Sequence, residues 1–351
     1  GAIRDREALA NEHAHAAGFV HQVQQFVVPR HLDRQLRQPV LAQTRQAAEQ
    51  RGRIVAVLRK VVGDEDEEAL ALARKKFKEK NKNQPFADEI DKWDSTTFLD
   101  KVRITINGKI TNTAIILLGK PEASHYLSPA VAQVTWKLDS TEQAYEHFDP
   151  PFFLNTTRVY QKIRNTKYKL LPGNTLFPIE VDKYEPWVIL EALHNCIVHQ
   201  DYTMRSRIVL TEKVDELIFT NAGNFYEGSV DDYTLTDKTP DKYRNFFLAK
   251  AMVNLGMIET LGYGIKKMYG EQKRRFFPMP QYDLKNPDKV KLKILGKIID
   301  ENYTRRLIER TDLSLETVIY LDKVQKKEKL TKEETQKLRK QNLVEGRYPN
   351  L

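Results

Sequence analysis

Residues 191–202 read EALHNCIVHQDY, and this stretch places an acid, an amide and two imidazoles directly after an apolar run. Pro186 suits the first turn of a helix, where its missing N–H is not needed. Leu190, Leu193 and Ile197 then recur at helical spacing, which predicts a helix with one buried stripe. The polar residues of the stretch fall between these positions and need a separate explanation.

A second face of this helix carries Glu191, Asn195 and His199, each one turn from the next, with His194 beside them. An amide oxygen such as that of Asn195 can hold a hard cation like Mg²⁺, which in turn carries phosphates. A carboxylate one turn earlier can orient or deprotonate a water molecule. The two histidines do not have the spacing of the helical zinc pair in metalloproteases, which excludes that chemistry. On the residues alone, a partly exposed polar helix edge is the alternative.

Two further segments follow in a regular order. After EALHNCIVHQDY the chain shows IFTNAGNF and then YRNFFLAKAMVNLGMIETLGYGIKKM. Across residues 186–270 this order and spacing resemble the N-box region of the GHKL ATPases. The resemblance is closer to the divergent ATP-binding domain at the C-terminus of RecG-like helicase relatives and Schlafen-type bacterial regulators. In that group an E-A-x-x-N-x-x-x-H-x-D-Y helix precedes a strand pair, an N-P-G-G type turn, R-N-x-x-x-A and L-G-x-I-E-x-x-G-x-G-I.

The resemblance implies ATP and Mg²⁺ as ligands of this region. Glu191 matches the catalytic carboxylate, and Asn195 matches the amide that holds Mg²⁺ through the nucleotide. The other residues at nucleotide-binding positions are Asn221 and Gly223 in the adenine-side turn, Arg244 and Asn245 after a variable lid, and Gly262 and Gly264 in the second glycine motif. Glycines there let backbone N–H groups approach phosphate, although a plain turn between helices is the alternative. Related turns carry an Asp that reads the adenine amine, so Asn221 leaves the base specificity open.

The upstream segment STTFLDKVRITINGKITNTAIILLGKPEA allows two local structures. Asn107-Gly108 between β-branched residues predicts a two-residue hairpin, whereas Thr111 can cap a short helix that ends at Gly119. The segment resembles the end of the Schlafen-like AlbA domain, whose G-K-x-T-x-A-x-x-L-x-G pattern favours the helix. The matching residues are Gly108, Lys109, Thr111, Ala114, Leu117 and Gly119. The Glu–Phe–Lys signature of the AlbA core is missing from residues 1–62, so no nuclease role is carried over.

The chain carries a net charge of +9, which is concentrated at its two ends. Residues 1–62 hold ten Lys and Arg against five Asp and Glu, and residues 285–351 hold seventeen against eleven. Basic ends indicate a polyanionic partner, although solubilising lysines explain the same counts. The single cysteine, Cys196, excludes an internal disulfide. Because no apolar run of about 18 residues and no signal peptide is recognisable, we expect a cytoplasmic protein that is not in a membrane.

We expect an α+β protein of several domains. Residues 1–62 are compositionally distinct and unassigned, and their histidines lack a compact metal-ligand spacing. We expect 63–140 to be the end of a partial AlbA-like α/β domain, 141–285 a GHKL-like α/β ATP-binding sandwich, and 286–351 a winged helix-turn-helix. Within these ranges the patterns predict helices over 65–84, 140–165 and 290–302, a strand over 130–139, and two strands over 205–223 joined near Lys213.

The last domain carries the DNA-binding prediction. We expect a recognition helix at about Ser314–Gln325, and a capping box from Thr331 to Glu334 opens the next helix. The residues expected to contact DNA are Thr317, Tyr320 and Lys323 on the outer face of the recognition helix, with Lys326, Lys327 and Lys329 at phosphates. A small helical dimerisation or lid module with solvated lysines is the alternative.

These expectations lead to three functional hypotheses. The first is a DNA-binding transcriptional regulator, in which bound ATP and Mg²⁺ close the 224–243 loop and change how the end domains are held. ATP turnover is slow or absent in that case. The second is an ATPase or nucleic-acid-processing enzyme of a helicase-like or defence system. The third is a non-enzymatic interaction protein with a decayed nucleotide pocket, and each hypothesis leaves homo-oligomerisation open.

Overall fold

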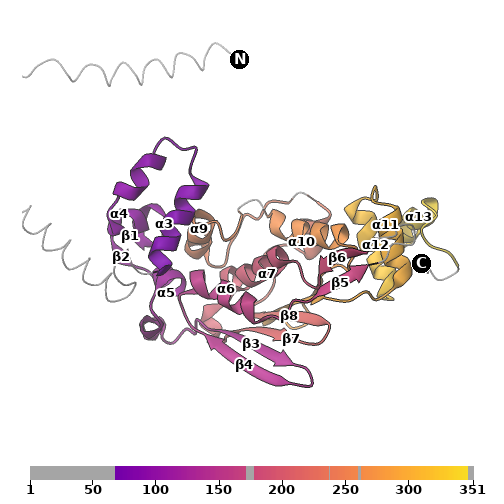
Figure 1. Cartoon of the computed structure of the whole chain (residues 1–351), viewed down its shortest axis with the longest axis horizontal. Coiled ribbons are helices and arrows are strands. Elements are labelled where there is room, and N and C mark those ends of the chain that lie inside the picture. The colour runs from indigo at the N-terminus through magenta and orange to yellow at the C-terminus, as the bar shows by residue number, and fades with distance from the viewer. Residues whose placement is uncertain (1–67, 171–177, 237, 260–261, 347–351) are drawn as a thin grey trace, which may run out of the picture. The chain divides into compact units, whose positions relative to one another are not determined.

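A computed structural model describes residues 68–170, 178–236, 238–259 and 262–346 of the chain. The predictions for residues 1–62 therefore lie outside the described residues. The central feature is a six-stranded mixed sheet with the order β4-β3-β7-β8-β10-β9 (Figure 1). Its strands are β3 (Val134–Asp139), β4 (Gln143–Phe148), β7 (Ile208–Glu212), β8 (Glu216–Ala222), β9 (Gln281–Asp283) and β10 (Lys289–Leu295).

One face of this sheet is buried under helices. Strands β3 and β7 run parallel, and the other neighbouring pairs are antiparallel. Leu210, Phe219 and Leu292 are cross-strand partners on three adjacent strands, and all three are buried. Because side chains alternate along a strand, the residues between them point to the opposite face. The helices on the buried side are α6 (Phe152–Lys162), α7 (Pro186–His199) and α10 (Tyr263–Arg274) (Figure 1).

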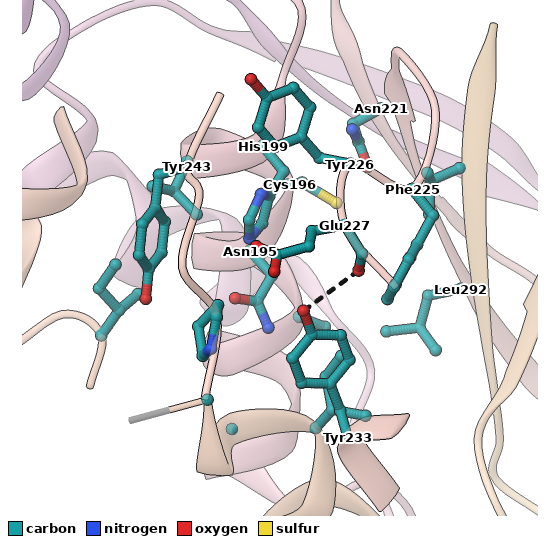
Figure 2. Close-up of a pocket in the computed structure, with 18 of the residues that line it drawn as sticks. Asn195, Cys196, His199, Asn221, Phe225, Tyr226, Glu227, Tyr233, Tyr243 and Leu292 are labelled. Atoms are coloured by element: carbon teal, nitrogen blue, oxygen red, sulfur yellow. Dashed lines mark hydrogen bonds between the residues drawn. The ribbon is translucent and has the colours of Figure 1, made fainter. Parts of the chain in front are cut away.

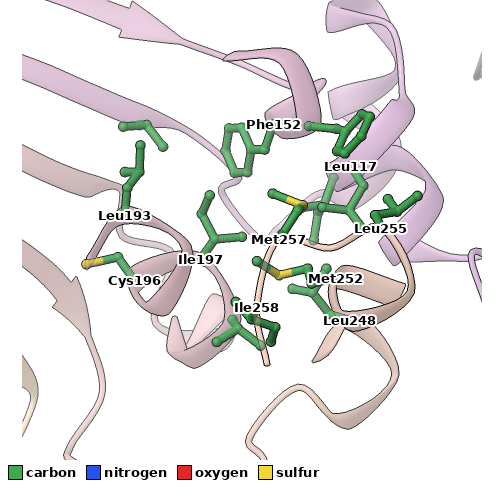
Figure 3. Close-up of a cluster of buried hydrophobic side chains, with 14 of the residues drawn as sticks. Leu117, Phe152, Leu193, Cys196, Ile197, Leu248, Met252, Leu255, Met257 and Ile258 are labelled. Atoms are coloured by element: carbon green, nitrogen blue, oxygen red, sulfur yellow. The ribbon is translucent and has the colours of Figure 1, made fainter. Parts of the chain in front are cut away.

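Helix α7 forms as the sequence predicts, with Pro186 in its first turn. Leu193 and Ile197 from its predicted apolar stripe are completely buried. Figure 3 shows Ile197 in a cluster with Leu248 and Met252 of α9 (Phe246–Asn254). Each such side chain contributes about 1.5–3 kcal/mol through burial. This packing fixes α7 against α9 and helps to determine which of its polar residues face the remaining space.

The N-terminal described part contains both local structures that the sequence allowed. Asn107 and Gly108 have φ angles of 51° and 71°, as a two-residue hairpin turn requires, and they join β1 (Thr105–Ile106) to β2 (Lys109–Ile110). The Thr111 side chain then accepts a hydrogen bond from the Ala114 N–H and caps the next helix. The expectation that the helix excludes the hairpin was wrong, because the two are consecutive. The helical elements here are α3 (Glu68–Lys80), η1 (Ala87–Lys92), α4 (Ser95–Lys101), α5 (Asn112–Leu118) and η2 (Pro121–Leu127).

Two segments predicted as helices contain strands instead. Within 140–165, β4 occupies residues 143–148 and pairs with β3 before α6 begins. Within 290–302, β10 pairs with both β8 and β9. The sequence KVKLKIL of β10 alternates lysine with apolar residues, and this period of two suits a strand with one buried face. The sheet therefore extends past residue 285, where the sequence placed the end of the middle domain.

The C-terminal part is helical, and its helix starts match the sequence. The Ser314 side chain accepts from the Thr317 N–H, and the predicted capping box joins Thr331 and Glu334. Tyr303, Leu321 and Leu338 belong to a second hydrophobic cluster. The helices are α11 (Glu301–Glu309), α12 (Leu315–Gln325) and α13 (Lys332–Lys340). No strand follows α13 within the described residues, so the predicted winged helix is not confirmed.

The remaining elements are β5 (Lys167–Leu170), β6 (Ile179–Asp182), η3 (Tyr202–Met204) and α8 (Val230–Thr234). Strands β5 and β6 form a separate two-stranded antiparallel sheet. Helix α8 lies inside the predicted lid segment 224–243. In the part of the chain that the structure describes, none of the helices combines the length and apolar character needed to cross a bilayer.

Candidate functional site

A cavity of about 120 Å³ lies between α7, the buried face of the sheet, the 224–243 loop and the start of α10 (Figure 2). The predicted site residues that line it are Glu191, Asn195, Asn221, Gly262 and Gly264. Further lining residues, which the sequence did not single out, are Phe225, Tyr226, Glu227, Tyr243, Glu259 and Tyr282. The predicted site residues among them are up to 73 positions apart in the sequence, counting from 191 to 264.

Glu191 is the central acid of the cavity, and only 8% of its surface is exposed. The Asn195 amide donates to its Oε1 at 3.2 Å. Burial raises the pKa of the carboxyl to about 7, and the hydrogen bond from Asn195 opposes this rise. A carboxyl with this pKa is part protonated at neutral pH, which suits a group that takes up and releases protons there.

Two glycines bring the start of α10 against this acid. Gly262 has a φ of +74°, and a Cβ atom there would lie 2.6 Å from Pro240 Cδ. Gly264 follows in the first turn of α10, where a Cβ atom would lie 1.9 Å from Glu191 Oε1. Because real Cβ atoms do not come within 3.0 Å of such neighbours, any other residue at 264 would displace the Glu191 carboxylate or the start of α10. The first N–H groups of a helix have no partner within it, so they are suited to bind an anion.

The two histidines of the quoted stretch do not carry charge near neutral pH. His194 donates from Nδ1 to the Met257 carbonyl oxygen at 2.8 Å, and burial lowers its pKa to about 4. Burial, aided by the charge of Arg244, lowers the pKa of His199 to about 4 as well. The His199 ring stacks on Tyr243 with a centroid distance of 6.1 Å. His199 lines the cavity as a neutral ring, and His194 connects α7 to the segment after α9.

Three predicted nucleotide-binding residues lie outside the lining of the cavity. Gly223 has a φ of +96° and packs against Arg244 and Asp201. The Arg244 guanidinium donates to Asp201 Oδ2 at 3.0 Å and to Asn224 Oδ1 at 2.6 Å. The Asn245 amide donates to the carbonyl oxygens of residues 198 and 200 at the end of α7. These residues hold the two ends of the 224–243 loop to the end of α7.

Glu227 holds this loop over the cavity. Its Oε2 accepts from the N–H groups of Asp241 at 3.1 Å and Lys242 at 2.8 Å. The Tyr233 hydroxyl donates to the carbonyl oxygen of Glu227 at 3.1 Å, the dashed line in Figure 2. Ligand pockets usually exceed about 300 Å³, so a nucleotide would enter this cavity only after the loop moves.

The opposite end of the cavity is mostly apolar. Phe225 meets Tyr282 edge to face with a centroid distance of 5.9 Å, and Leu292 lies nearby (Figure 2). Asn221 is buried here, and its amide nitrogen donates to the Ala222 carbonyl oxygen at 3.1 Å. This bond uses the nitrogen and leaves its Oδ1 as an acceptor. Flat rings around one buried acceptor suit a nucleobase that presents a donor group.

The donor set fits a magnesium ion carried by a nucleotide better than an ion held by protein alone. In the described parts of the chain, no group of three or more His, Cys, Asp or Glu residues is arranged to hold a metal ion. Mg²⁺ keeps several waters and commonly takes one or two protein oxygens together with phosphates. Asn195 Oδ1 is suitably placed beside Glu191, because the amide nitrogen of Asn195 makes the hydrogen bond to that acid.

Thr317 and Tyr320, two residues of the predicted DNA-reading face of α12, point inward, so the prediction that they lie on its outer face was wrong. Thr317 is 1% exposed and Tyr320 is 9% exposed, and the Tyr320 hydroxyl donates to Glu316 at 2.7 Å. Lys323 donates to Glu334 at 2.7 Å, and Lys326 donates to the Met279 carbonyl oxygen at the same distance. Of the expected DNA contacts, Lys327 and Lys329 are exposed. The periodicity of a helix gives its faces, but its tertiary partners decide which face is buried.

Some residues of the site that the sequence did not single out lie inside the quoted motifs. Asp201 belongs to the quoted stretch, and Glu259 belongs to the LGMIET segment, so the pattern itself points to both. Tyr282 and Leu292 come to the cavity through pairing of β9, β10 and β8. No local signal identifies them, because their place depends on long-range strand order.

Comparisons with known proteins relate two ranges of this sequence to described families. Residues 206–294 match the family described as "Putative ATP-dependent DNA helicase recG C-terminal". Residues 44–134 match a domain of unknown function, DUF8451, so the expected AlbA resemblance is not confirmed. None of the curated proteins matches the sequence.

The fold is similar to the crystal structure of the DIP2311 protein from Corynebacterium diphtheriae, with a TM-score of 0.54 and 17% sequence identity. The similarity covers 75% of this chain and 52% of that protein, so the chain spans about half the length of its structural neighbour. At this identity the likeness concerns the fold alone. The match over 206–294 supports a relationship with a divergent ATPase-like family.

Proposed function

We propose that the chain binds a magnesium–nucleoside triphosphate, ATP by preference, in the cavity between α7 and the start of α10. The observation that carries this proposal is the approach of Gly264 to the Glu191 carboxylate. It leaves the first N–H groups of α10 open to phosphate beside an acid and an amide. The match of residues 206–294 to an ATP-dependent family supports the same ligand.

Each residue has a definite task in this proposal. Asn195 Oδ1 ligates Mg²⁺, which neutralises phosphate charge when it is bound. Glu191, with its pKa of about 7, orients a water and accepts its proton. Gly262 and Gly264 let the backbone of α10 approach the phosphates. Asn221 accepts a hydrogen bond from the base.

We also propose that the site works as a switch with slow turnover. The 224–243 loop closes the cavity through the Glu227 contacts with Asp241 and Lys242. A nucleotide that displaces these contacts changes the position of the loop each time it binds or leaves. Product release then depends on reopening the loop, which limits the rate.

Calorimetric titration of the full chain with Mg-ATP, together with phosphate release, tests the nucleotide proposal. We expect binding in the wild type, and binding without phosphate release in Glu191→Gln. We expect weakened binding in Asn195→Ala that depends less on Mg²⁺. Glu79→Gln on the surface of α3 is the control and leaves both properties unchanged. Absence of any Mg-nucleotide binding by the folded wild type contradicts the proposal.

The basic tail supports a second proposal, that the chain is a DNA-binding regulator. Residues 285–351 hold seventeen Lys and Arg against eleven acids. Because α12 presents a buried face, the contacts must come from exposed residues such as Lys327, Lys329 and Lys332. Charge reversal of these three should abolish salt-dependent binding to duplex DNA. Unchanged duplex binding refutes this part and leaves the nucleotide proposal untouched.

A further inference from the structure

The face of the six-stranded sheet that points away from α6, α7 and α10 carries no helix of the described residues over its β3, β4 and β7 strands (Figure 1). We call it the open face. Side-chain alternation assigns Tyr145, His147, Lys137, Thr211 and Ile218 to it, opposite the buried neighbours on the same strands. Tyr145 is the most exposed large hydrophobic residue on this face, at 72%.

Two cross-strand rows run over the open face from β4 to β10, and each has a ring at one end and a lysine at the other. The first row consists of the successive partners His147, Thr135, Val209, Thr220 and Lys291. The second consists of Tyr145, Lys137, Thr211, Ile218 and Lys293. Strands lie about 4.8 Å apart, so each row spans about 19 Å. The rings of Tyr145 and His147 lie side by side with centroids 5.2 Å apart.

Three cations at one end of this face have no acidic partner among the described residues. Lys289 and Lys291 point to the open face from β10, and Arg207 precedes β7 on the same side. All three are exposed, and none forms an ion pair with a described residue. Arg207 precedes Val209 by two residues, and Val209 pairs with Thr220 of β8. The antiparallel register therefore places Arg207 opposite Ala222, the residue that pairs with Lys289 on the other side of β8.

The acids of the open face lie mostly at the other end and are already engaged. Glu216 pairs with Lys293 at 3.3 Å and with Lys213 at 3.1 Å, and Asp139 lies 4.0 Å from Lys137. Asp283 is the cross-strand partner of Lys291 but forms no ion pair with it. The free positive charge is therefore concentrated around Arg207, Lys289 and Lys291.

A cleft of about 680 Å³ continues this surface beside β10. Lys291 and Lys293 line one wall, and Lys323 of α12 and Lys326, which follows α12, line another. Lys326 pairs with Asp322 at 2.5 Å, and Lys323 is held by Glu334, so both lysines are fixed in place. The cleft also contains Asp231, Asp283 and Glu328, which keep its charge close to balance. The strongest attraction for an anion therefore remains on the sheet.

We propose that the open face binds single-stranded nucleic acid. Bases stack on Tyr145 and His147, since every base has a flat face that an exposed ring can cover. Phosphates lie along the cations Arg207, Lys289 and Lys291. Apart from Lys137, which lies 4.0 Å from Asp139, the residues between them are threonine, valine and isoleucine, whose short side chains let a strand lie across the sheet. A duplex hides its bases from such rings, which makes a single strand the better fit.

This inference does not rest on the proposed nucleotide site, because that site lies on the other face of the same strands. On β10, Val290 and Leu292 line the nucleotide cavity, while Lys289 and Lys291 point to the open face. Loss of one activity therefore leaves the other measurable. Charge reversal of Lys327, Lys329 and Lys332 should abolish duplex binding by the tail and leave binding of a single strand to the open face unchanged.

Fluorescence anisotropy of a labelled oligothymidine with the full chain tests the proposal over a range of salt concentrations. Tyr145→Ala should weaken binding by about 5- to 100-fold, the loss of one stacked base. Tyr126→Ala is the matched control, because Tyr126 is also exposed and also lies beside a histidine, His125. The pair Arg207→Ala and Lys291→Ala should reduce the slope of log affinity against log salt by about 1.4. Lys75→Ala, on α3, is the charge control.

Each outcome decides the proposal. Three results together support the proposal. Tyr145→Ala weakens binding of the single strand, Tyr126→Ala leaves its affinity unchanged, and the paired Arg207 and Lys291 variant has a smaller salt slope. The same affinity for a duplex of equal length, or identical binding by wild type and Tyr145→Ala, overturns it. If the folded wild-type chain does not bind the oligothymidine at low salt, the proposal is overturned as well. Mg-ATP titration of Tyr145→Ala shows that the nucleotide cavity is unaffected.

Discussion

Replacing Gly264 with alanine probes the contact on which the nucleotide site depends. The added Cβ would lie 1.9 Å from Glu191 Oε1, whereas ordinary contacts begin at 3.4 Å. Either the carboxylate or the start of α10 must therefore move by about 1.5 Å, the difference between these distances. A displacement of about 1 Å at a reacting group can cost about 100-fold in rate. We expect Gly264→Ala to lower phosphate release by that order and to weaken Mg-ATP binding by at least about tenfold, because the phosphate approach is blocked.

The same helix provides a matched control. Gly270 also lies in α10, but a Cβ atom there meets nothing within 4 Å. Gly270→Ala should leave nucleotide binding unchanged and stabilise the fold by up to about 1 kcal/mol through helix propensity. Calorimetry gives the affinities, and urea unfolding followed by circular dichroism gives the stabilities. If Gly264→Ala folds and binds Mg-ATP as tightly as Gly270→Ala, the carboxylate and the start of α10 do not form the phosphate site.

Three other substitutions test separate parts of the account. Because the pKa of Glu191 is raised from 4.5 to about 7 in the folded chain, its stabilising protonated form is lost as pH rises through 7. Glu191→Gln should therefore be more stable than wild type by up to about 3 kcal/mol at pH 8, with a much smaller difference at pH 5 in urea titrations; an equal difference at both pH values contradicts the buried acid. Gly223→Ala, which forces a side chain into a φ of +96° against Arg244, should lose about 1–3 kcal/mol of stability by the same method; wild-type stability would show that the loop end is loosely held. His199→Gln should leave the pH profile of nucleotide binding between pH 5.5 and 8 unchanged, since His199 with a pKa of about 4 is neutral throughout; a profile that shifts identifies His199 as a titrating group.

Local signals predicted the helix at the centre of the site. Its signals are Pro186 in the first turn and the buried pair Leu193 and Ile197, which depend on neighbours within a few residues. The capping box at Thr331, which opens α13, is local in the same way. The grouping of Glu191 and Asn195 followed from helical spacing. The structure places both residues in the same cavity as Gly264, whose sequence position is 69 or more residues away.

Long-range pairing explains what the sequence did not provide. β4 and β10 were predicted within helices, and each gains its hydrogen bonds from distant strands. Thr317 and Tyr320 were placed on an outer face, yet they pack into the C-terminal cluster, because α12 is covered by α10, α11 and α13. Tyr282 reaches the cavity only through the register of β9 with β10. In each case a tertiary partner selects among local structures of similar stability.

A structure of the full chain with a non-hydrolysable ATP analogue and Mg²⁺ would show directly whether the nucleotide binds between α7 and α10. We expect phosphate density between Asn195 and the start of α10, with the metal about 2.1 Å from Asn195 Oδ1. We also expect the Glu227 contacts with Asp241 and Lys242 to be rearranged. An analogue that binds elsewhere, or a cavity that keeps its present contacts at saturating analogue, contradicts the claim.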